Sequence, residues 1–236
     1  MKLIVVLLSC LYLWSCQQVE KNTTGSEEQN VPVCNPPEPK SYEQIKTEIA
    51  AARNRFAVKP FILNDSFINR ISDFWVNAIG NDLYSKWQNT PWDFNGITTK
   101  PQQGFIACGY FVTTLLRDMD LSINRIKLST CASSQMMKSL APGQPLKNLS
   151  CLDYQSFNDK LKDLGKGVYI IGLDFHTGFI VNDGTENWFI HSNYIGRKGV
   201  VKESVMNSDA LKASKTRWLI SLTADKAFIQ KWLRSN

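Results

Sequence analysis

Histidine is scarce in this chain, with only two among 236 residues. The sequence also has no Gly-rich phosphate loop, no Cys/His spacing typical of zinc sites and no internal repeat. We therefore expect no nucleotide, no metal and no other cofactor. The 27 basic and 21 acidic residues give a net charge of +6 without a basic block or an RNA-type aromatic motif. Nucleic acid is accordingly excluded as the expected partner.

The N-terminal region lacks an apolar run long enough for an ordinary membrane span. The apolar stretch 3–14 follows Lys2 and has the length of a signal-peptide core. It ends at Cys16 in the run Leu-Trp-Ser-Cys, which resembles a bacterial lipobox. By that resemblance, residues 1–16 are a lipoprotein signal peptide and Cys16 carries the lipid. The protein is then exported and anchored to a membrane of the bacterial cell envelope; ordinary secretion and an uncleaved anchor are the alternatives.

The rest of the chain has the composition of a globular protein. Its hydrophobic content of 43%, with seven Trp and twelve Phe, allows a sizeable core in one main domain. Residues 17–40 are polar and rich in proline toward their end, which predicts a flexible tether. We divide the remainder into a helical N-terminal extension, 41–87, and a main domain, 88–236.

The order of the predicted elements indicates an α+β fold. A capping box at Ser41 predicts a helix over 41–55, and amphipathic spacing predicts a second helix from residue 64 or 65 to about 87. A loop over 88–104 leads into a third helix. Beyond it we expect a helix near 156–164 capped by Ser156, strands at 168–173, 177–182, 185–191, 200–203 and 217–222, and a last helix over 224–234. Helices followed by an antiparallel sheet are typical of α+β domains.

A cysteine lies at the expected start of the third helix. If this helix begins near Ala107, Cys108 is in its first turn, where unpaired N–H groups and the helix dipole favour a thiolate. The same N–H groups suit a developing oxyanion. A thiol nucleophile also needs a base, and the base needs an orienting partner.

The two histidines flank one predicted β-hairpin. A two-residue turn at Asp183-Gly184 would place His176 directly opposite His191. A register shifted by two residues would instead put Asn193 opposite His176 and leave His191 on the diagonal. In either register, one face of the hairpin carries a base and an orienting residue. Together with the helix cysteine, these residues predict a catalytic site.

Two further cysteines, Cys131 and Cys151, flank an insertion over 130–155. In an oxidising compartment they could form a disulfide that closes a loop of about twenty residues. Cys34 lies in the tether and has no evident partner.

Three segments share motifs with a known family. Residues 90–96 read Thr-Pro-Trp-Asp-Phe-Asn-Gly, residues 106–111 read Ile-Ala-Cys-Gly-Tyr-Phe, and the hairpin contains His-Thr-Gly-Phe-Ile-Val and Phe-Ile-His-Ser. These segments resemble the Thr-Pro-Tyr-x-x-Gly-Gly, Asp-Cys-Ser-Gly, His-x-Gly-Ile-x-x and Ile-His-Ala motifs of NlpC-type cell-wall cysteine peptidases. That family is a branch of the papain-like fold, and the resemblance covers about residues 88–195.

By this resemblance Cys108 is the nucleophile, His176 the base and His191 the orienting residue. Trp92 stands where the family often has a Tyr hydroxyl that helps to bind the substrate or the oxyanion. Gln102, six residues before the cysteine, has the offset of the oxyanion glutamine of papain and is a candidate for that task. The nearest rival family is that of the CHAP amidases.

The resemblance implies hydrolysis of peptide bonds in peptidoglycan stem or cross-bridge peptides through a Cys thioester. One alternative is a non-enzymatic envelope lipoprotein that uses a peptidase-like fold to bind cell-wall peptides or a partner. Another is an acyl or amide transferase of the same fold. The expected partners are therefore peptidoglycan peptides and, through the lipid anchor, a membrane, and a monomer is favoured.

Overall fold

The computed structural model describes residues 38–58 and 62–235. The predicted signal peptide 1–16, with Cys16, and nearly all of the tether 17–40 lie outside these residues. From Pro39 onward the chain folds as one compact unit. Within the described ranges, no helix has the length and apolarity needed to cross a bilayer.

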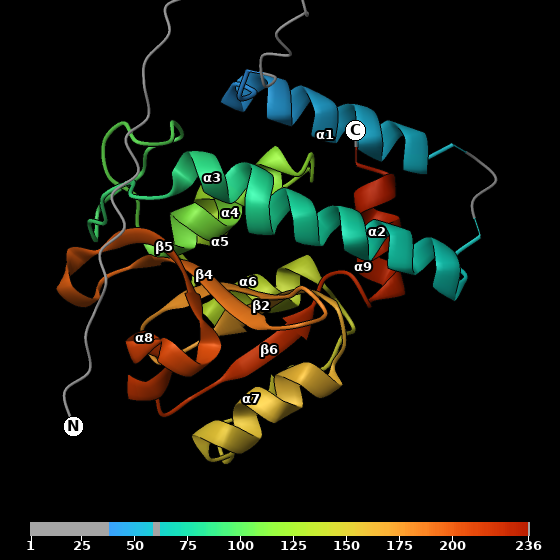
Figure 1. Ribbon diagram of the computed structural model, residues 1–236. Helices are drawn as coiled ribbons and strands as arrows, with labels where there is room; N and C mark the ends of the chain where they lie inside the picture. The colour runs from blue at the N-terminus through green and yellow to red at the C-terminus, as the bar shows by residue number, and fades with distance from the viewer. Residues whose placement is uncertain (1–37, 59–61, 236) are drawn as a thin grey trace, which may run out of the picture. The chain divides into compact units, whose positions relative to one another are not determined.

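Six strands of the described chain form one antiparallel sheet in the order β1–β6–β2–β3–β4–β5 (Figure 1). The strands are β1 (Lys147–Asn148), β2 (Gly167–Gly172), β3 (Thr177–Asn182), β4 (Asn187–Asn193), β5 (Gly199–Ser204) and β6 (Trp218–Ser221). Most of the helices precede the sheet in the chain, so the predicted α+β class is confirmed.

Helices occupy each of the predicted spans, but the helices within 125–140 and at 209–213 are not predicted, and the second predicted span is partly π-helical. The helices are α1 (Tyr42–Phe56), α2 (Asp65–Asn77), α3 (Tyr84–Trp87), α4 (Cys108–Asp118), α5 (Arg125–Ser129), α6 (Ser133–Leu140), α7 (Tyr154–Asp163), α8 (Asp209–Ala213) and α9 (Lys226–Leu233). A π-helical segment, η1 (Ala78–Leu83), joins α2 to α3, and two short 3₁₀ turns are η2 (Ile195–Arg197) and η3 (Val205–Asn207).

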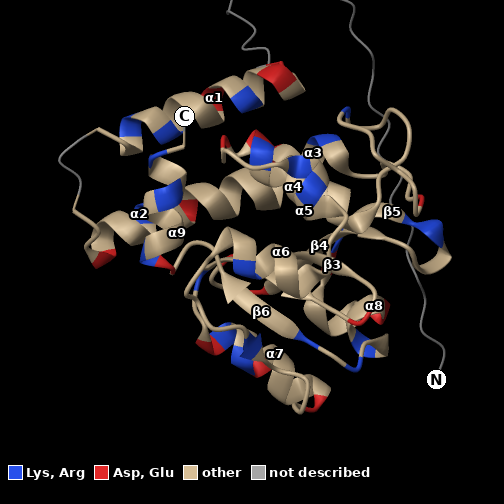
Figure 2. Cartoon of the chain, turned by 180° about the vertical axis from the view of Figure 1, so that it is seen from behind, with Lys and Arg blue, Asp and Glu red and all other residues tan. Residues whose placement is uncertain are grey.

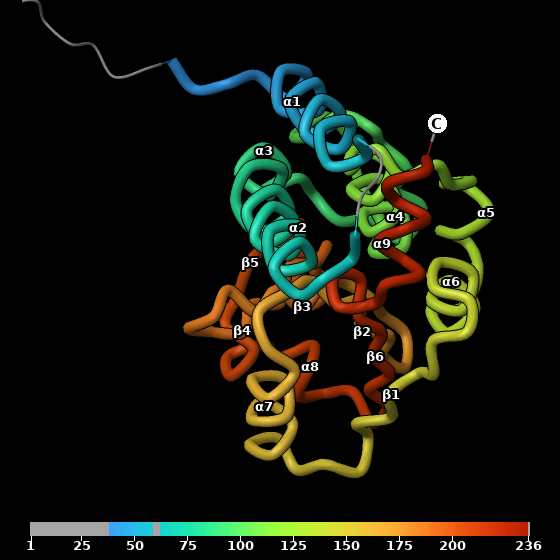
Figure 3. The backbone as a smooth tube through the Cα atoms, turned by 90° about the vertical axis from the view of Figure 1, so that its right-hand side faces the viewer, coloured from blue at the N-terminus to red at the C-terminus, as the bar shows by residue number. Residues whose placement is uncertain are grey.

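Helices cover both faces of the sheet (Figures 1 and 3). One layer contains α2, α4 and α9, with α1 packed outside it, and the other contains α7 and α8. Side chains alternate along a strand, so Val168 and Ile170 of β2 join the first apolar cluster while Tyr169 and Ile171 join the second. Because both faces are covered, β2 reads as a continuous apolar run and is buried throughout.

The helices α1 to α3 belong to the same core as the main domain. α1 begins at the capping box of Ser41, as predicted. The Trp75 ring packs against the Trp232 ring of α9 with centroids 5.4 Å apart, and the Trp87 ring lies 6.0 Å from that of Phe111 in α4. This extension therefore helps to hold α4, which carries the candidate nucleophile.

Charged residues lie mainly on the outer faces of the helices. Figure 2 shows Lys and Arg interleaved with Asp and Glu along α1 and α7. Pairs three residues apart form ion pairs, such as Lys46–Glu43 at 2.8 Å and Lys162–Asp159 at 3.7 Å. Exposed pairs of this kind contribute little to stability, so the fold depends on its two apolar clusters.

One predicted helix cap is wrong. Asp153, not Ser156, caps α7, because the Asp153 carboxylate accepts hydrogen bonds from the backbone N–H and the hydroxyl of Ser156 at 2.9 and 2.6 Å. The insertion before it is also structured, since it contains α6 and the edge strand β1, which pairs with β6.

Candidate functional site

The candidate nucleophile begins α4. Cys108 is the first helical residue, after Ala107 in an extended conformation, and the Ala107 N–H donates to the Gly96 carbonyl at 2.8 Å. The N–H groups of Cys108, Gly109 and Thr177 are close enough to the Cys108 sulfur to lower its pKa. The sulfur therefore lies between the start of α4 and the start of β3.

Burial nevertheless dominates at Cys108 and raises the pKa of the thiol above its ordinary value. The N–H groups at the helix start favour the thiolate, as expected, but they do not offset the loss of solvation. A nucleophile that remains a neutral thiol needs a base to take its proton during the attack.

Three hydrogen-bonded side chains include a candidate base, His176, which lines the same two cavities as Cys108. The Nε2 of His176 lies 2.7 Å from the Nδ1 of His191, and the Nε2 of His191 lies 3.1 Å from a carboxylate oxygen of Glu203. Both imidazoles are buried, and Glu203 is half-buried.

Burial determines the charge states of this chain of side chains. It lowers the pKa of His176 well below the ordinary value, and His191 lowers that pKa further. Burial also lowers the pKa of His191, although Glu203 opposes this shift. Burial alone would raise the pKa of Glu203, but hydrogen bonds from His191 and Ser208 outweigh it and the net shift is downward. At neutral pH these three hydrogen-bonded side chains are thus two neutral imidazole rings and one carboxylate.

The carboxylate fixes both tautomers. Glu203 accepts only, so the Nε2 of His191 must carry a proton. A neutral His191 then has a bare Nδ1, which accepts a hydrogen bond from the Nε2–H of His176. The Nδ1 of His176 is left with a free lone pair. It is buried and has no hydrogen-bond partner among the described residues.

The hairpin forms in the register shifted by two residues. The ladder pairs Asn182 with Asn187, so the loop contains the four residues 183–186 and the predicted two-residue turn is wrong. The reason is the Asp183 carboxylate, which accepts hydrogen bonds from two backbone N–H groups of the loop and from the indole of Trp188. These bonds stabilise a wider turn than the Asp-Gly pair alone indicates.

In this register Asn193 falls opposite His176, and Gly178 falls opposite His191. A Cβ at Gly178 would lie 2.6 Å from the ring of Phe189 and 2.8 Å from the Cβ of His191. The His191 ring stacks on that of Phe189 with centroids 3.9 Å apart. Glycine thus leaves the space that lets His191 reach His176 on the diagonal.

Cys108 and His176 together line two cavities of about 470 and 690 Å³. The bare Nδ1 is therefore on a residue that shares its surroundings with the thiol. Trp92 lines the larger cavity, where its ring lies 6.4 Å from that of Tyr194. No described residue accepts a hydrogen bond from the Trp92 indole, so this N–H can serve a substrate.

Two other predicted site residues do not join this group. Gln102 is exposed, lines neither cavity and donates from its side chain to the Gln88 carbonyl at 3.4 Å. Asn193 accepts from the Ile195 N–H at 2.8 Å, and its buried Nδ2 has no partner among the described residues.

The two insertion cysteines are free thiols, and no disulfide joins Cys131 to Cys151. Cys131 donates to the Leu128 carbonyl at 3.3 Å and lines the smaller cavity, whereas Cys151 is exposed. Within the described parts of the chain, no three His, Cys, Asp or Glu side chains gather closely enough to hold a metal ion.

Sequence reasoning missed Glu203 as part of the site. A strand at 200–203 is predicted, but only its pairing with β4 shows which face Glu203 occupies. His191 pairs with Val201, and Glu203 follows two residues later on the same face of β5. The usable signal is an acidic residue near the end of the strand that follows the histidine hairpin.

Glu203→Gln should lower kcat/KM about a hundredfold, at the lower end of the range of general acid–base contributions. The amide oxygen of glutamine still accepts from His191, but it supplies no negative charge to stabilise the ring cation that forms during proton transfer. Steady-state kinetics on folded protein measure the effect. Glu186→Gln, an exposed change on the hairpin loop, is the matched control and should behave as wild type. Equal kinetics for the two variants would remove Glu203 from the site.

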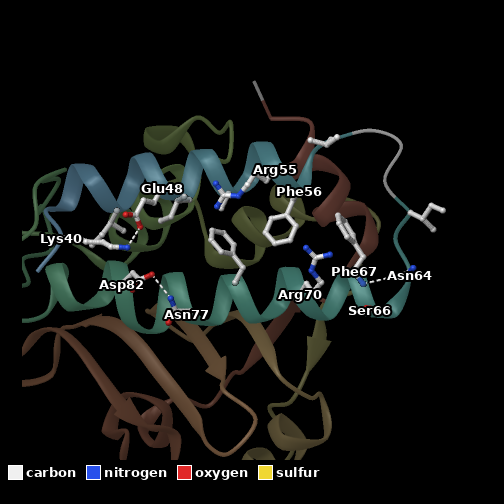
Figure 4. Close-up of a pocket in the computed structure, with 16 residues that line it drawn as sticks. Lys40, Glu48, Arg55, Phe56, Asn64, Ser66, Phe67, Arg70, Asn77 and Asp82 are labelled. Atoms are coloured by element: carbon white, nitrogen blue, oxygen red, sulfur yellow. Dashed lines mark hydrogen bonds and ion pairs between the residues drawn. The ribbon is translucent and has the colours of Figure 1, made fainter. Parts of the chain in front are cut away.

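A larger cavity of about 800 Å³ lies between α1 and α2, with Arg55 and Phe56 on one helix and Arg70 on the other (Figure 4). No histidine or cysteine lines it. The Cys108 site is therefore identified by its chemistry, not by its size.

Comparison with known proteins gives no match: no family model fits the chain, and no curated protein or solved structure is significantly similar to it.

Proposed function

We propose that the protein is a cysteine peptidase or amidase with a papain-like core that hydrolyses peptide bonds of peptidoglycan stem or cross-bridge peptides. One observation supports the proposal that the protein is a cysteine hydrolase. The Glu203–His191–His176 chain leaves a bare Nδ1 on a residue that lines both cavities with Cys108. The motif resemblance to NlpC-type peptidases supports the papain-like core and the substrate class. The lipobox-like N-terminus supports an exported, lipid-anchored protein that acts on wall near the membrane.

In the first half-reaction the Nδ1 of His176 takes the proton of the Cys108 thiol as the sulfur bonds to the substrate carbonyl carbon. The carbonyl electron pair moves to oxygen, where the N–H of Cys108 at the helix start stabilises it. Collapse of this intermediate breaks the C–N bond, and His176 gives the proton to the leaving nitrogen. The acyl group remains on Cys108 as a thioester.

In the second half-reaction water attacks the thioester and gives a proton to the Nδ1 of His176. The C–S bond then breaks, the carboxylic acid leaves, and the sulfur takes the proton back. His191 and Glu203 act through His176: they hold its tautomer and stabilise its transient positive charge.

Activity should fall at acid pH with a midpoint below about 6.5, the ordinary histidine value. His176 must be neutral to accept a proton, and burial lowers its pKa. Activity is therefore full above the shifted pKa and is lost as the pH falls through it. The pH profile of kcat/KM measures this group in the free enzyme. A midpoint above 6.5 would contradict the buried neutral base.

Digestion of purified sacculi tests the proposed reaction. Hydrolysis adds one water to each cleaved bond, so mass spectrometry should find fragments with new carboxyl and amino ends. Fragments joined to an added amine or alcohol would indicate acyl transfer and contradict hydrolysis. Sacculi that stay unchanged, as in the buffer control, would contradict the proposed function.

A further inference from the structure

The larger cavity at Cys108 has an apolar lining. Its walls include Trp92, Phe94, Ile97, Tyr110, Phe175 and Tyr194, and none of its lining residues is Asp, Glu, Lys or Arg. The His176 ring lies edge-on to that of Tyr194 with centroids 5.1 Å apart. The apolar wall therefore continues up to the proposed base.

Several of these side chains are exposed. Phe94 is 79% exposed, Phe175 is 96% exposed and Ile97 is 60% exposed. Phe175 directly precedes His176 in the chain. Large apolar side chains gathered at the mouth of a cavity are typical of surfaces that bind an apolar partner. Here they surround the opening that leads to the proposed nucleophile.

The smaller cavity has a different character. Ser133, Ser134 and Thr216 contribute hydroxyl groups to its walls, and Asp174 is its one acidic residue. The Asp174 carboxylate already accepts hydrogen bonds from the N–H groups of Lys215 and Thr216. The thiol and the proposed base thus lie between an apolar cavity and a polar one.

Neither of these two cavities is lined by Lys or Arg. A bare wall peptide presents carboxylates, and a carboxylate that is removed from water needs a cation or several hydrogen-bond donors. The larger cavity offers no cation, and its few polar side chains, such as Asn95 and Thr130, are outnumbered by aromatic and aliphatic ones. Its walls match an alkyl chain or an aromatic group.

We propose that the substrate amide joins a bulky apolar group, which occupies the cavity of Trp92, Phe94 and Tyr194, to a polar remainder in the cavity of Ser133 and Thr216. This inference rests on the proposed function for the position of the scissile bond. Among the proposed wall-peptide substrates, it favours those with an apolar chain or ring on one side of the scissile amide.

Binding to the full-chain Cys108→Ala variant tests the inference without turnover. The probes are N-acyl glycinamides with acetyl, hexanoyl and decanoyl chains, measured by calorimetry. Each buried methylene should tighten binding about fourfold, the equivalent of about 0.8 kcal/mol. Affinity that is independent of chain length would overturn the inference.

Variants at the cavity mouth locate the effect. Phe94→Ser and Ile97→Ser, each in the Cys108→Ala background, should reduce the decanoyl-to-acetyl affinity ratio several-fold, because both residues line the larger cavity and not the smaller one. Ile126 is 65% exposed and lines neither cavity, so Ile126→Ser should keep the ratio. An equal loss in the Ile126→Ser variant would place binding elsewhere and overturn the inference.

Hydrolysis of the same probes by the wild-type protein separates the two proposals. Binding that tightens with chain length supports the apolar subsite, whether or not a probe is cleaved. If neither a probe nor a sacculus is cleaved in that case, the result contradicts only the proposed function. Cleavage without chain-length dependence in binding supports the hydrolase and overturns the subsite.

Discussion

Cys108→Ala should lower the rate of sacculus digestion by about a thousandfold or more, as expected for the loss of a nucleophile that acts together with its base. Alanine has no group that can form the thioester, so the covalent route is lost. The reaction is followed by release of soluble fragments at a fixed protein concentration. Because Cys108 lines cavities and is not part of the two apolar core clusters, the variant should fold as the wild type does.

Cys151→Ala is the control for this variant, because Cys151 is an exposed free thiol away from both cavities. It should digest sacculi at the wild-type rate. If Cys108→Ala does so as well, then Cys108 is not the nucleophile, and a non-enzymatic role in binding wall peptides becomes the better interpretation.

Gly178→Ala should combine a loss of stability with a loss of activity. The new Cβ would lie 2.6 Å from Phe189 and 2.8 Å from the Cβ of His191, so both residues must shift and the contact of His191 with His176 is disturbed. We expect a loss of about 1–3 kcal/mol in the free energy of unfolding, as for overpacked cores. We also expect kcat/KM to fall about a hundredfold or more, since the tautomer of His176 is no longer fixed.

Denaturant unfolding and steady-state kinetics on the folded fraction measure these two effects separately. Gly80→Ala is the matched control, because a Cβ there meets Val181 at an ordinary contact distance of 3.4 Å. It should change neither quantity appreciably. Wild-type kcat/KM in the Gly178→Ala variant would show that the contact between the two histidines is not required.

Local signals in the sequence predict much of this fold. The capping box at Ser41 depends on side chains within one helical turn and is confirmed. The helix start expected near Ala107 from the apolar pattern is also confirmed, at Cys108. The predicted two-residue hairpin turn is wrong because the Asp183 carboxylate accepts hydrogen bonds from across the loop, including one from the Trp188 indole. A dipeptide turn rule does not contain those contacts.

The candidate site is predictable only in part for the same reason. The order of a helix cysteine and two hairpin histidines is visible in the sequence, and the structure places Cys108 and His176 at common cavities. The contribution of Glu203 depends on the register of β5 against β4. The raised pKa of the Cys108 thiol depends on burial. Neither tertiary property can be derived from spacing along the chain.

Nitrogen NMR of the imidazole rings tests the proposed site most directly, because a chain with only two histidines gives just four ring-nitrogen signals. At pH 7 we expect both rings to be neutral and protonated at Nε2, with the Nδ1 of His176 bare and the Nδ1 of His191 accepting the hydrogen bond. In the Glu203→Gln variant the His191 signals should change more than in Glu186→Gln. A proton on the Nδ1 of His176 in the wild-type protein at pH 7 would contradict a base held ready for Cys108.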